Sequence, residues 1–501
     1  MVAVAIRVDA SQYIGSGHVM RCLALAEELK KNVNNVMFVM RPQPGDLCDY
    51  IEKRGFQVKR LPQPQVKMIP KSDCDYKAWL QVSELQDANE FLLFASDAEV
   101  VIVDHYGIGA SWERLIKLRM SCILISIDDL VRDHISDMLI DQTASRMANE
   151  YEQTAPGSHL LVGSNYALLK AQFADLYPIA INKKIDFENH KLLLTMGGID
   201  QPNATVKVLK TLSKATAPIP TTVVLGKKSP HFESVVSFCA QNSDWVTHIP
   251  FTDDMAALML EHTIAIGASG STSWERACMG LPSIIIPIAE NQQQICQNLV
   301  KENVAISLSL DEVPEMLNAK LDVLLKNFEV LRANSLSLCD GKGCARVVAT
   351  INSLVRHGIV LKHATNEDIR QVYDWQCLSE TRRYALNPKI PTWKEHRVWM
   401  KNKLKSSKDF FYIVCYDAQQ VGVVRLDNVS SSSFVISIFI APKYHGKGLA
   451  KRALAAIDIL HPSIEISATV LKENIASQAL FLSAGYKQVN EELFIRRKLE
   501  R

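Results

Sequence analysis

Short apolar runs alternate with helical patterns through the first 170 residues of the chain. Polar residues follow each run, which is typical of buried strands in a parallel sheet with helical crossovers. The runs span residues 2–8, 35–40, 99–104, 122–128 and 138–141. The pattern therefore predicts an α/β domain over residues 1–170.

A second α/β unit is predicted over residues 171–355. Its strands span residues 191–196, 222–226, 246–250, 263–267 and 283–287. Gly197 and Gly198 form a turn after the first of these strands, and Asn203 stands at the N-cap of a helix predicted over residues 204–212. The order of strand, glycine loop and helix thus occurs twice in the chain.

The pattern changes again at residues 355–358, which we interpret as a short linker. The elements predicted beyond it are a helix from residue 366, antiparallel strands over 410–415 and 421–426, an alternating strand over 434–440 and a helix that ends near residue 460. Residues 360–501 are therefore predicted to form a third domain, of α+β class and ordinary size.

The length and charge of the chain narrow its class. A chain of 501 residues is too long for one ordinary core, so two or three domains are expected. The 56 Lys and Arg residues nearly balance the 54 Asp and Glu residues, and a net charge of +2 gives no reason to expect nucleic-acid or membrane binding. Arg7 and Asp9 interrupt the first apolar run too early for a signal peptide, and no run is long enough to span a bilayer. We expect a cytoplasmic protein.

The cysteines give no sign of a disulfide framework or a metal site. Eleven of them are scattered singly, without a C-x-x-C pair or a Cys/His cluster at metal-ligand spacing. The odd number and the absence of secretory signals favour reduced thiols. We expect mostly buried cysteines and no bound metal.

The first loop carries the most distinctive motif, IGSGHVMR at residues 14–21. Gly15 and Gly17 let the backbone approach a ligand closely, and exposed N–H groups at the start of the following helix attract anions. His18 stands in the first turn, where an imidazole that titrates near neutrality suits a general base. A loop histidine is more often a hydrogen-bonded structural residue, so the string alone leaves both roles open.

Polar residues also stand where other strands end. They are Asp9 after the first strand, Asp104 and His105 after the third, and the pair at residues 128–129. Ligands bind at the carboxyl ends of strands in open α/β sheets, so these residues are candidates for a cleft. Turn or cap chemistry explains them equally well.

The second unit holds a small-residue loop, ASGSTSWE at residues 268–275. Small side chains there allow a diphosphate to reach helix N–H groups and hydroxyls, and Glu275 can accept hydrogen bonds from both hydroxyls of a ribose. Taken singly, these features could be ordinary turn chemistry. The candidate ligand contacts of this unit are Gly197, Gly198, Ser269, Gly270, Ser271, Thr272, Glu275, Glu290, Asn291 and Gln292.

In the third domain, a strand leads into APKYHGKGLA at residues 441–450. Gly446 and Gly448 before a helix form a cradle for a pyrophosphate. A G-x-G alone is weak, but NIASQALFLSAGY follows about 25 residues later, at residues 474–486.

Two of these motifs carry a family resemblance for roughly the first 355 residues. The opening string closely resembles the PseG family, the UDP-sugar hydrolases of pseudaminic acid synthesis, and this implies His18 as catalytic base. The Ser-Trp-Glu segment resembles the nucleotide half of the MurG-like GT-B glycosyltransferases, which implies that Glu275 holds the ribose of UDP. The resemblance implies a GT-B-like pair of Rossmann-type halves without a metal, and a sugar side formed by Asp9, Gly15, Gly17, Arg21, Asp104 and His105.

The motifs of the third domain resemble the GNAT acetyltransferases, whose Q/R-x-x-G-x-G/A loop binds acetyl-CoA. Lys443 occupies the Q/R position and keeps its charge. Many GNAT enzymes carry a tyrosine at the position of Phe481 that protonates the departing thiolate, so water or another group must do so here, or the domain is less active than its relatives. The implied acetyl-CoA contacts are Phe439, Ile440, Lys443, His445, Gly446, Lys447, Gly448, Leu449, Ala450, Asn474, Ser477 and Phe481.

A looser similarity points to the acetyl acceptor. Trp375, Thr381, Arg382, Arg383, Ile390, His396 and Trp399 look like the substrate side of PseH, the acetyltransferase one step before PseG. A helical hairpin with core tryptophans explains Trp375 and Trp399 equally well.

Together, the resemblances imply a bifunctional enzyme of pseudaminic acid biosynthesis. It would hydrolyse UDP-2,4-diacetamido-2,4,6-trideoxy-β-L-altropyranose with inversion at C1 and N-acetylate the 4-amino UDP-sugar precursor from acetyl-CoA. Other enzymes of the same pathway are expected partners, and a related sugar such as that of legionaminic acid stays open. Two alternatives remain, a GT-B glycosyltransferase with an appended acetyltransferase and a non-catalytic sensor of nucleotide sugars and CoA.

Overall fold

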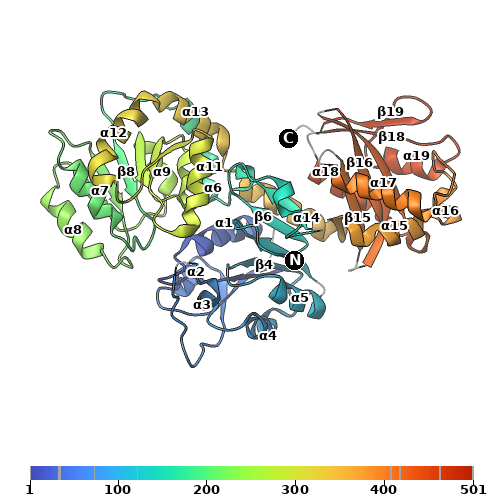
Figure 1. The fold of residues 1–501 in the computed structure, drawn as a ribbon, viewed down its shortest axis with the longest axis horizontal. Coiled ribbons are helices and arrows are strands. Elements are labelled where there is room, and N and C mark those ends of the chain that lie inside the picture. The colour runs from blue at the N-terminus through green and yellow to red at the C-terminus, as the bar shows by residue number, and fades with distance from the viewer. Residues whose placement is uncertain are drawn as a thin grey trace.

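The chain folds into three lobes, each built on one sheet (Figure 1). The computed structural model describes residues 2–31, 35–72, 74–120, 122–156, 158–406, 409–416, 419–430, 432–461 and 464–498. Along the chain the lobes are coloured blue to teal, green to yellow, and orange to red. The third lobe contacts the first one, on the side away from the second lobe.

The first lobe holds seven parallel strands in the order β3-β2-β1-β4-β5-β6-β7. They are β1 (Ala3–Val8), β2 (Asn35–Met40), β3 (Gln57–Arg60), β4 (Val100–Asp104), β5 (Ile123–Ile127), β6 (Met138–Asp141) and β7 (His159–Val162). The helices are α1 (Gly17–Lys31), α2 (Cys48–Lys53), α3 (Tyr76–Leu80), α4 (Glu84–Ala95) and α5 (Ala110–Arg119). The five predicted strands are confirmed, and the two edge strands β3 and β7 were not predicted.

The second lobe holds six parallel strands in the order β10-β9-β8-β11-β12-β13. They are β8 (Leu192–Thr195), β9 (Thr221–Val224), β10 (Val246–Ile249), β11 (Ile264–Gly267), β12 (Ser283–Ile285) and β13 (Ala305–Ser307). The helices are α6 (Ala171–Asn182), α7 (Ala204–Leu212), α8 (Phe232–Gln241), α9 (Met255–Glu261), α10 (Thr272–Cys278), α11 (Gln293–Lys301), α12 (Val313–Lys326) and α13 (Phe328–Leu338). Five strands match the prediction, and β13 was not predicted.

One expected helix cap is wrong in this lobe. Asn203 does precede α7, but its side chain makes no capping hydrogen bond, and its backbone is left-handed with a φ of 58°. The carboxylate of Asp200 accepts instead from the N–H groups of Ala204 and Thr205, at 2.8 and 2.9 Å. A carboxylate three positions earlier can curl back to the same N–H groups that an N-cap side chain would reach.

Helix α14 (Gly343–His357) returns from the second lobe to the first. Its buried residues Val347, Ile351 and Leu354 belong to the core that also contains α1. We therefore propose that residues 343–357 complete the first half, although the sequence placed them in the second. The predicted linker is wrong, because only Gly358, with a φ of 55°, separates α14 from the next strand.

The third lobe is a mixed sheet in the order β14-β15-β16-β17-β18-β20-β19. Its strands are β14 (Ile359–His363), β15 (Phe410–Tyr416), β16 (Gln419–Ser430), β17 (Ser433–Ile440), β18 (Glu465–Thr469), β19 (Lys487–Gln488) and β20 (Leu493–Arg496). The helices are α15 (Ile369–Gln376), α16 (Ser379–Arg382), α17 (Trp393–Lys405), α18 (Leu449–Leu460) and α19 (Ile475–Ser483). The predicted antiparallel pair is β15–β16, while β17 and β18 are parallel.

Gly343 marks a tight backbone crossing where α14 leaves the second lobe. A Cβ atom there would lie 2.2 Å from the carbonyl oxygen and 2.7 Å from the nitrogen of Ala167. We predict that Gly343→Ala lowers the stability of the protein by about 1–3 kcal/mol, since the two segments must separate. Thermal melting followed by circular dichroism measures this loss. Gly270→Ala is the control, because nothing lies within 4 Å of a Cβ there; equal melting temperatures for both variants would contradict the prediction.

Candidate active site between the first two lobes

The loop between β1 and α1 is held in shape by its own groups. Gly15 N donates to Ser11 O at 2.9 Å, and Ser11 Oγ accepts from the N–H groups of Tyr13 and Ile14. Gly15 has a φ of 77°, a left-handed conformation that favours glycine. The loop thereby delivers His18 into the first turn of α1, where its side chain is almost entirely buried.

His18 is bonded to a carboxylate at the end of a neighbouring strand. Its Nδ1 lies 2.6 Å from Oδ1 of Asp104, the last residue of β4. Because β4 pairs in parallel with β1, both strands end at the same edge of the sheet. An ionised carboxylate can only accept, and at 2.6 Å it is closer to Nδ1 than Arg21 Nη2 at 3.2 Å, so in the neutral ring the proton sits on Nδ1 and Nε2 keeps its lone pair. This tautomer makes Nε2 the nitrogen that can take a proton.

Asp104 is ionised although it is fully buried. Burial alone would raise its pKa, but the charge of Arg21 and the contact with His18 outweigh burial and hold the pKa well below its usual range. Arg21 donates from Nε and Nη2 to the two oxygens of Asp104, at 2.6 and 2.7 Å. Arg21, which the sequence placed among the substrate contacts, is therefore directed into the protein.

Asp9 and His105 lie beneath the same edge in a buried polar network. Asp9 accepts from Nη1 and Nη2 of Arg7 at 2.6 and 2.9 Å and from the backbone N–H of Arg41 at 2.7 Å. His105 Nδ1 accepts from Gly107 N at 2.9 Å, and its Nε2 lies 3.5 Å from Asp9. Burial lowers the pKa of His105 to about 4, so the ring is neutral at pH 7. Both residues are buried, which suits support of the loop better than contact with a sugar.

An aromatic cluster that the sequence did not reveal packs against His18. The ring of Tyr106 meets the His18 ring edge-on with 4.5 Å between centroids. Tyr76 and Trp79 pack in turn against Tyr106, at 5.0 and 5.9 Å. The only sequence signal was the position of Tyr106 after a strand end, because Tyr76 and Trp79 come from α3, far away in the chain.

The small-residue loop of the second lobe faces the His18 loop directly. A Cβ atom on Gly17 would lie 3.7 Å from Ser271 Oγ, and one on Gly198 would lie 3.1 Å from Ser16 Oγ. Two sets of loops thus face each other across one interface. The first lobe contributes Gly15 and Gly17, and the second contributes Gly197, Gly198, Gly270, Ser271 and Thr272. Ser269 is buried, and its Oγ donates to Gln292 O at 3.2 Å.

Glu275 lies one turn into α10, where it is half-buried. It makes no hydrogen bond or ion pair with any residue that the structure describes. Burial raises its pKa to about 7, and the opposing effects of Arg276 and Lys170 do not cancel this. Arg276 instead spans the loop, donating to Ala268 O at 2.8 Å and to Ser273 Oγ at 3.1 Å. Glu275 is thus free to accept from a ligand.

Glu290, Asn291 and Gln292 form a short 3-10 turn after β12. Glu290 is exposed and lies 3.4 Å from the thiol of Cys74, which comes from the first lobe. Gln292 Oε1 accepts from Ile288 N at 3.1 Å. Glu290 therefore lies where the two lobes meet.

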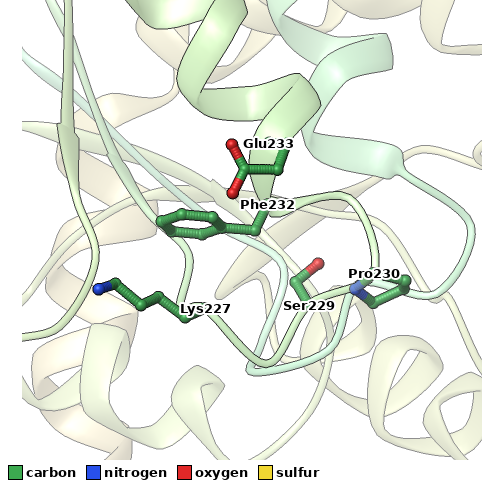
Figure 2. A pocket seen from close by; sticks show the side chains of 5 residues that line it. All are labelled: Lys227, Ser229, Pro230, Phe232 and Glu233. Atoms are coloured by element: carbon green, nitrogen blue, oxygen red, sulfur yellow. The ribbon is translucent and has the colours of Figure 1, made fainter.

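A surface pocket of about 320 Å³ follows β9 at the same carboxyl edge (Figure 2). Phe232 and Glu233 line it from the start of α8, and Lys227, Ser229 and Pro230 from the preceding loop. The adjacent Lys228 donates to Asp46 O of the first lobe at 2.7 Å. The sequence did not predict this pocket, which lies at the carboxyl end of β9, the strand next to β8.

The third lobe presents its glycine loop in the open. Gly446 and Gly448 have φ values of 76° and 71°, with nothing within 4 Å of a Cβ atom. The ammonium groups of Lys443 and Lys447 lie 4.7 and 5.6 Å from the ring of Tyr444. His445 bonds through Nε2 to Ile440 O at 2.7 Å, and Leu449 and Ala450 begin α18. Two cations and a helix start thus flank one open loop.

Next to this loop, β17 and β18 are paired over only three residues, from Ser433 to Val435 on β17. Phe439 and Ile440 lie beyond that pairing, where the two strands no longer bond to each other. Asn474 Oδ1 caps α19 by accepting from Ser477 N at 3.1 Å. Phe481 is buried against Tyr486 and Phe494, so its ring belongs to the core.

The residues proposed for the acetyl acceptor include both buried and exposed side chains. Trp375 and His396 are buried, and Trp399 lies under the guanidinium of Arg425 at 5.0 Å. Arg382 donates to Gln376 O and Asn387 O at 2.8 and 3.0 Å. Ile390 is exposed, and Thr381 and Arg383 lie near the surface.

Within the described part of the chain, no helix is long and apolar enough to cross a membrane. The same residues contain no group of three or more His, Cys, Asp or Glu side chains that could hold a metal ion. The eleven cysteines are free thiols, seven of them buried.

Comparison with known proteins agrees with this architecture. Residues 193–342 match the model of the glycosyltransferase family 28 C-terminal domain, and residues 359–487 match the acetyltransferase (GNAT) domain. The structure of MurG from Acinetobacter baumannii aligns over 70% of this chain and 99% of its own, with a TM-score of 0.50 at 15% identity. The predicted fold is confirmed: a GT-B-like pair of Rossmann-type domains is followed by an α+β GNAT domain.

Two relatives extend the comparison along the sequence. The UDP-2,4-diacetamido-2,4,6-trideoxy-β-L-altropyranose hydrolase of Campylobacter jejuni is 26% identical over 300 residues, which cover 60% of this chain and 96% of that protein. An uncharacterized protein of Methanocaldococcus jannaschii is 23% identical over 510 residues, 97% of both chains. The resemblance to PseG-type hydrolases is thereby confirmed, and the combination of a hydrolase-like part with a further domain recurs in a protein of similar length.

The state of Glu275 leads to a prediction about stability and pH. Its pKa is about 7 in the folded protein, above the value of 4.5 for a glutamate in water, so the folded state retains a proton between these values. The stability that this proton confers is fully present below about pH 4.5 and is lost as the pH rises through 7. The free energy of unfolding of Glu275→Gln should therefore rise relative to that of the wild type from pH 5 to pH 8, by at most about 3 kcal/mol.

Melting temperatures of both proteins at the two pH values measure this gain. Glu329→Gln, an exposed substitution on α13, is the control and should follow the wild type at both. A difference between Glu275→Gln and wild type that is the same at pH 5 and pH 8 would refute the assignment.

Proposed function

We propose that the first two lobes hydrolyse UDP-2,4-diacetamido-2,4,6-trideoxy-β-L-altropyranose to UDP and the free sugar. The observation that carries this proposal is the 2.6 Å contact between His18 Nδ1 and Asp104, which leaves Nε2 as a base, next in the chain to Gly17, which faces Ser271. The similarity to the Campylobacter jejuni hydrolase over most of that protein's length supports the choice of substrate.

In the proposed reaction, His18 Nε2 takes a proton from a water molecule as the water oxygen attacks C1 of the sugar. The bond between C1 and the UDP oxygen breaks, and UDP leaves with the bonding electrons. Because water attacks the face opposite UDP, the configuration at C1 inverts. Ser271, Thr272 and the backbone N–H groups before α10 would stabilise the charge that develops on the diphosphate.

Glu275 is proposed to hold the ribose. Its carboxylate has no partner in the described structure, so two ribose hydroxyls could both donate to it. Such bonds favour the ionised form over the protonated one. A bound nucleotide would therefore release the proton that the half-buried carboxyl otherwise retains near neutral pH.

The third lobe is proposed to transfer an acetyl group from acetyl-CoA to the 4-amino group of the UDP-sugar precursor. Gly446, Gly448 and the start of α18 offer N–H groups to the pyrophosphate, with Lys443 and Lys447 nearby. The thioester would lie where β17 and β18 separate. A neutral amine attacks its carbonyl carbon and the C–S bond breaks. The proton that the nitrogen loses passes through water to the departing thiolate, because Phe481 is buried and carries no proton to give.

The two activities would act on consecutive intermediates. Holding both sites in one chain raises the local concentration of the acetylated product near the hydrolase cleft. The end-to-end similarity to the Methanocaldococcus jannaschii protein favours this pairing over a chance fusion. Release of UDP in water without an acceptor distinguishes the hydrolase from a glycosyltransferase and from a non-catalytic sensor.

We predict that His18→Gln lowers kcat for UDP release by about a hundredfold or more, since the base is lost. Asp104→Asn should also slow the reaction, because an amide can donate to Nδ1 and favour the wrong tautomer. Proton and phosphorus NMR with the UDP-sugar measures both. His190→Gln is the matched control and should keep the wild-type rate. His190 precedes β8, at the end of the strand away from Gly197 and Gly198. Wild-type activity in His18→Gln would rule out the mechanism.

For the third lobe, we predict that Gly448→Ala raises KM for acetyl-CoA about tenfold while hydrolysis keeps its rate. Gly448 and Gly485 both have left-handed φ values, 71° and 84°, with open space around a Cβ atom. Gly485→Ala therefore imposes a similar backbone strain of about 1 kcal/mol without changing the loop. Thiol release from acetyl-CoA measures both variants, and equal KM values for the two would exclude this loop as the cofactor site.

A further inference from the structure

A closed ring of contacts surrounds His18, and one member of it, Asp129, has no role in the proposed reaction so far. We propose that Asp129, acting through Arg21, is a positioning residue for the His18–Asp104 pair; this inference rests on the proposed hydrolase function. The ring runs from His18 to Asp104, Arg21, Asp129 and Tyr106, and returns to His18.

The guanidinium of Arg21 forms the first link between Asp129 and the His18–Asp104 pair. Its Nε and Nη2 bond to Asp104, and its Nη1 donates to Asp129 Oδ2 at 3.0 Å. The side chains of Arg21 and Asp129 are only 6% and 8% exposed. All three nitrogens of the guanidinium thus donate to protein carboxylates, so Arg21 orients Asp104.

The other oxygen of Asp129 forms a second link to His18, through Tyr106. The hydroxyl of Tyr106 donates to Asp129 Oδ1, and the Tyr106 ring packs edge-on against the His18 ring. Asp129 therefore restrains His18 by two routes, one through charge and one through packing. Its neighbour Asp128 does neither, because it pairs with Arg132 at 2.7 Å.

The distances around Nδ1 show why this restraint matters. Arg21 Nη2 lies 3.2 Å from Nδ1 of His18, already within hydrogen-bonding distance, and 2.7 Å from its partner Asp104 Oδ1. A guanidinium released from Asp129 could turn toward Nδ1 and donate to it, which requires the tautomer with the proton on Nε2. That tautomer cannot act as base in the cleft. By holding Nη1, Asp129 keeps Arg21 on Asp104 and the lone pair on Nε2.

The ring also fixes His18 to the sheet edge. His18 and Arg21 are one turn apart on α1, Asp104 ends β4, and Asp129 follows β5. Three adjacent elements are thus tied together at the point where water must be held. A displacement of a catalytic group by about 1 Å can cost a hundredfold in rate.

The test compares Asp129→Asn with Asp133→Asn, the same change at an exposed position four residues later. Asp129→Asn should lower kcat by about tenfold to a hundredfold and leave KM within about twofold. Nitrogen-15 NMR of the free protein, with His18→Gln used to assign the signal, should show loss of the single Nδ1–H tautomer of His18. Asp133→Asn should match the wild type in both measurements.

Tyr106→Phe serves as a second variant, because it removes one bond to Asp129 and leaves the ring packed on His18. It should lower kcat severalfold without changing KM, and it decides the question if Asp129→Asn does not fold. An unchanged tautomer and unchanged kcat in folded Asp129→Asn, with an active wild type, would overturn the positioning role alone. An altered tautomer with a wild type that releases no UDP would uphold the positioning role and overturn the hydrolase.

Discussion

A carboxylate removed from water must be matched by cations and hydrogen-bond donors, and the first lobe is organised around this requirement. Two buried carboxylates at the carboxyl edge of the sheet, Asp9 and Asp104, are each held by an arginine, Arg7 and Arg21. The arginines are in turn shared with further acids, since Arg7 also pairs with Asp87 and Arg21 with Asp129. The result is a buried polar layer below the loop that carries His18, and the candidate base owes its tautomer to this layer.

The same lobe connects the whole chain. Helix α14 completes its core beside α1, and α18, which begins at the glycine loop of the third lobe, packs against the other side of α14. With Gly358 alone between α14 and β14, the acetyltransferase part is docked on the first lobe and is not held by a flexible tether. The helix that carries the candidate base and the helix that follows the candidate cofactor loop thus share one neighbour.

Sequence periodicity was sufficient for the buried central strands, because both faces of a covered sheet are apolar: Ile6 and Ile102 pack on one face, and Ala5 and Val101 on the other. It failed at β3, whose sequence QVKR is half exposed at an edge and lacks that signal. His18 was found because two glycines, Gly15 and Gly17, precede it in a short string. The sequence did not predict the contacts among Arg21, Asp129 and Tyr106, since these residues and their partners come from three separate segments that only the folded sheet brings together. Asp200 replaced Asn203 as a cap for a similar reason, because loop geometry decides which oxygen reaches the helix start.

The account depends most on water attacking C1 of the sugar from the side of His18. Hydrolysis of the UDP-sugar in water enriched in oxygen-18 tests this step directly, with the position of the label read by mass spectrometry and the configuration at C1 read by NMR before the anomers equilibrate. The account predicts the label on C1 of the free sugar, unlabelled UDP and an inverted anomer. Label in the terminal phosphate of UDP, or an anomer of retained configuration, would contradict it.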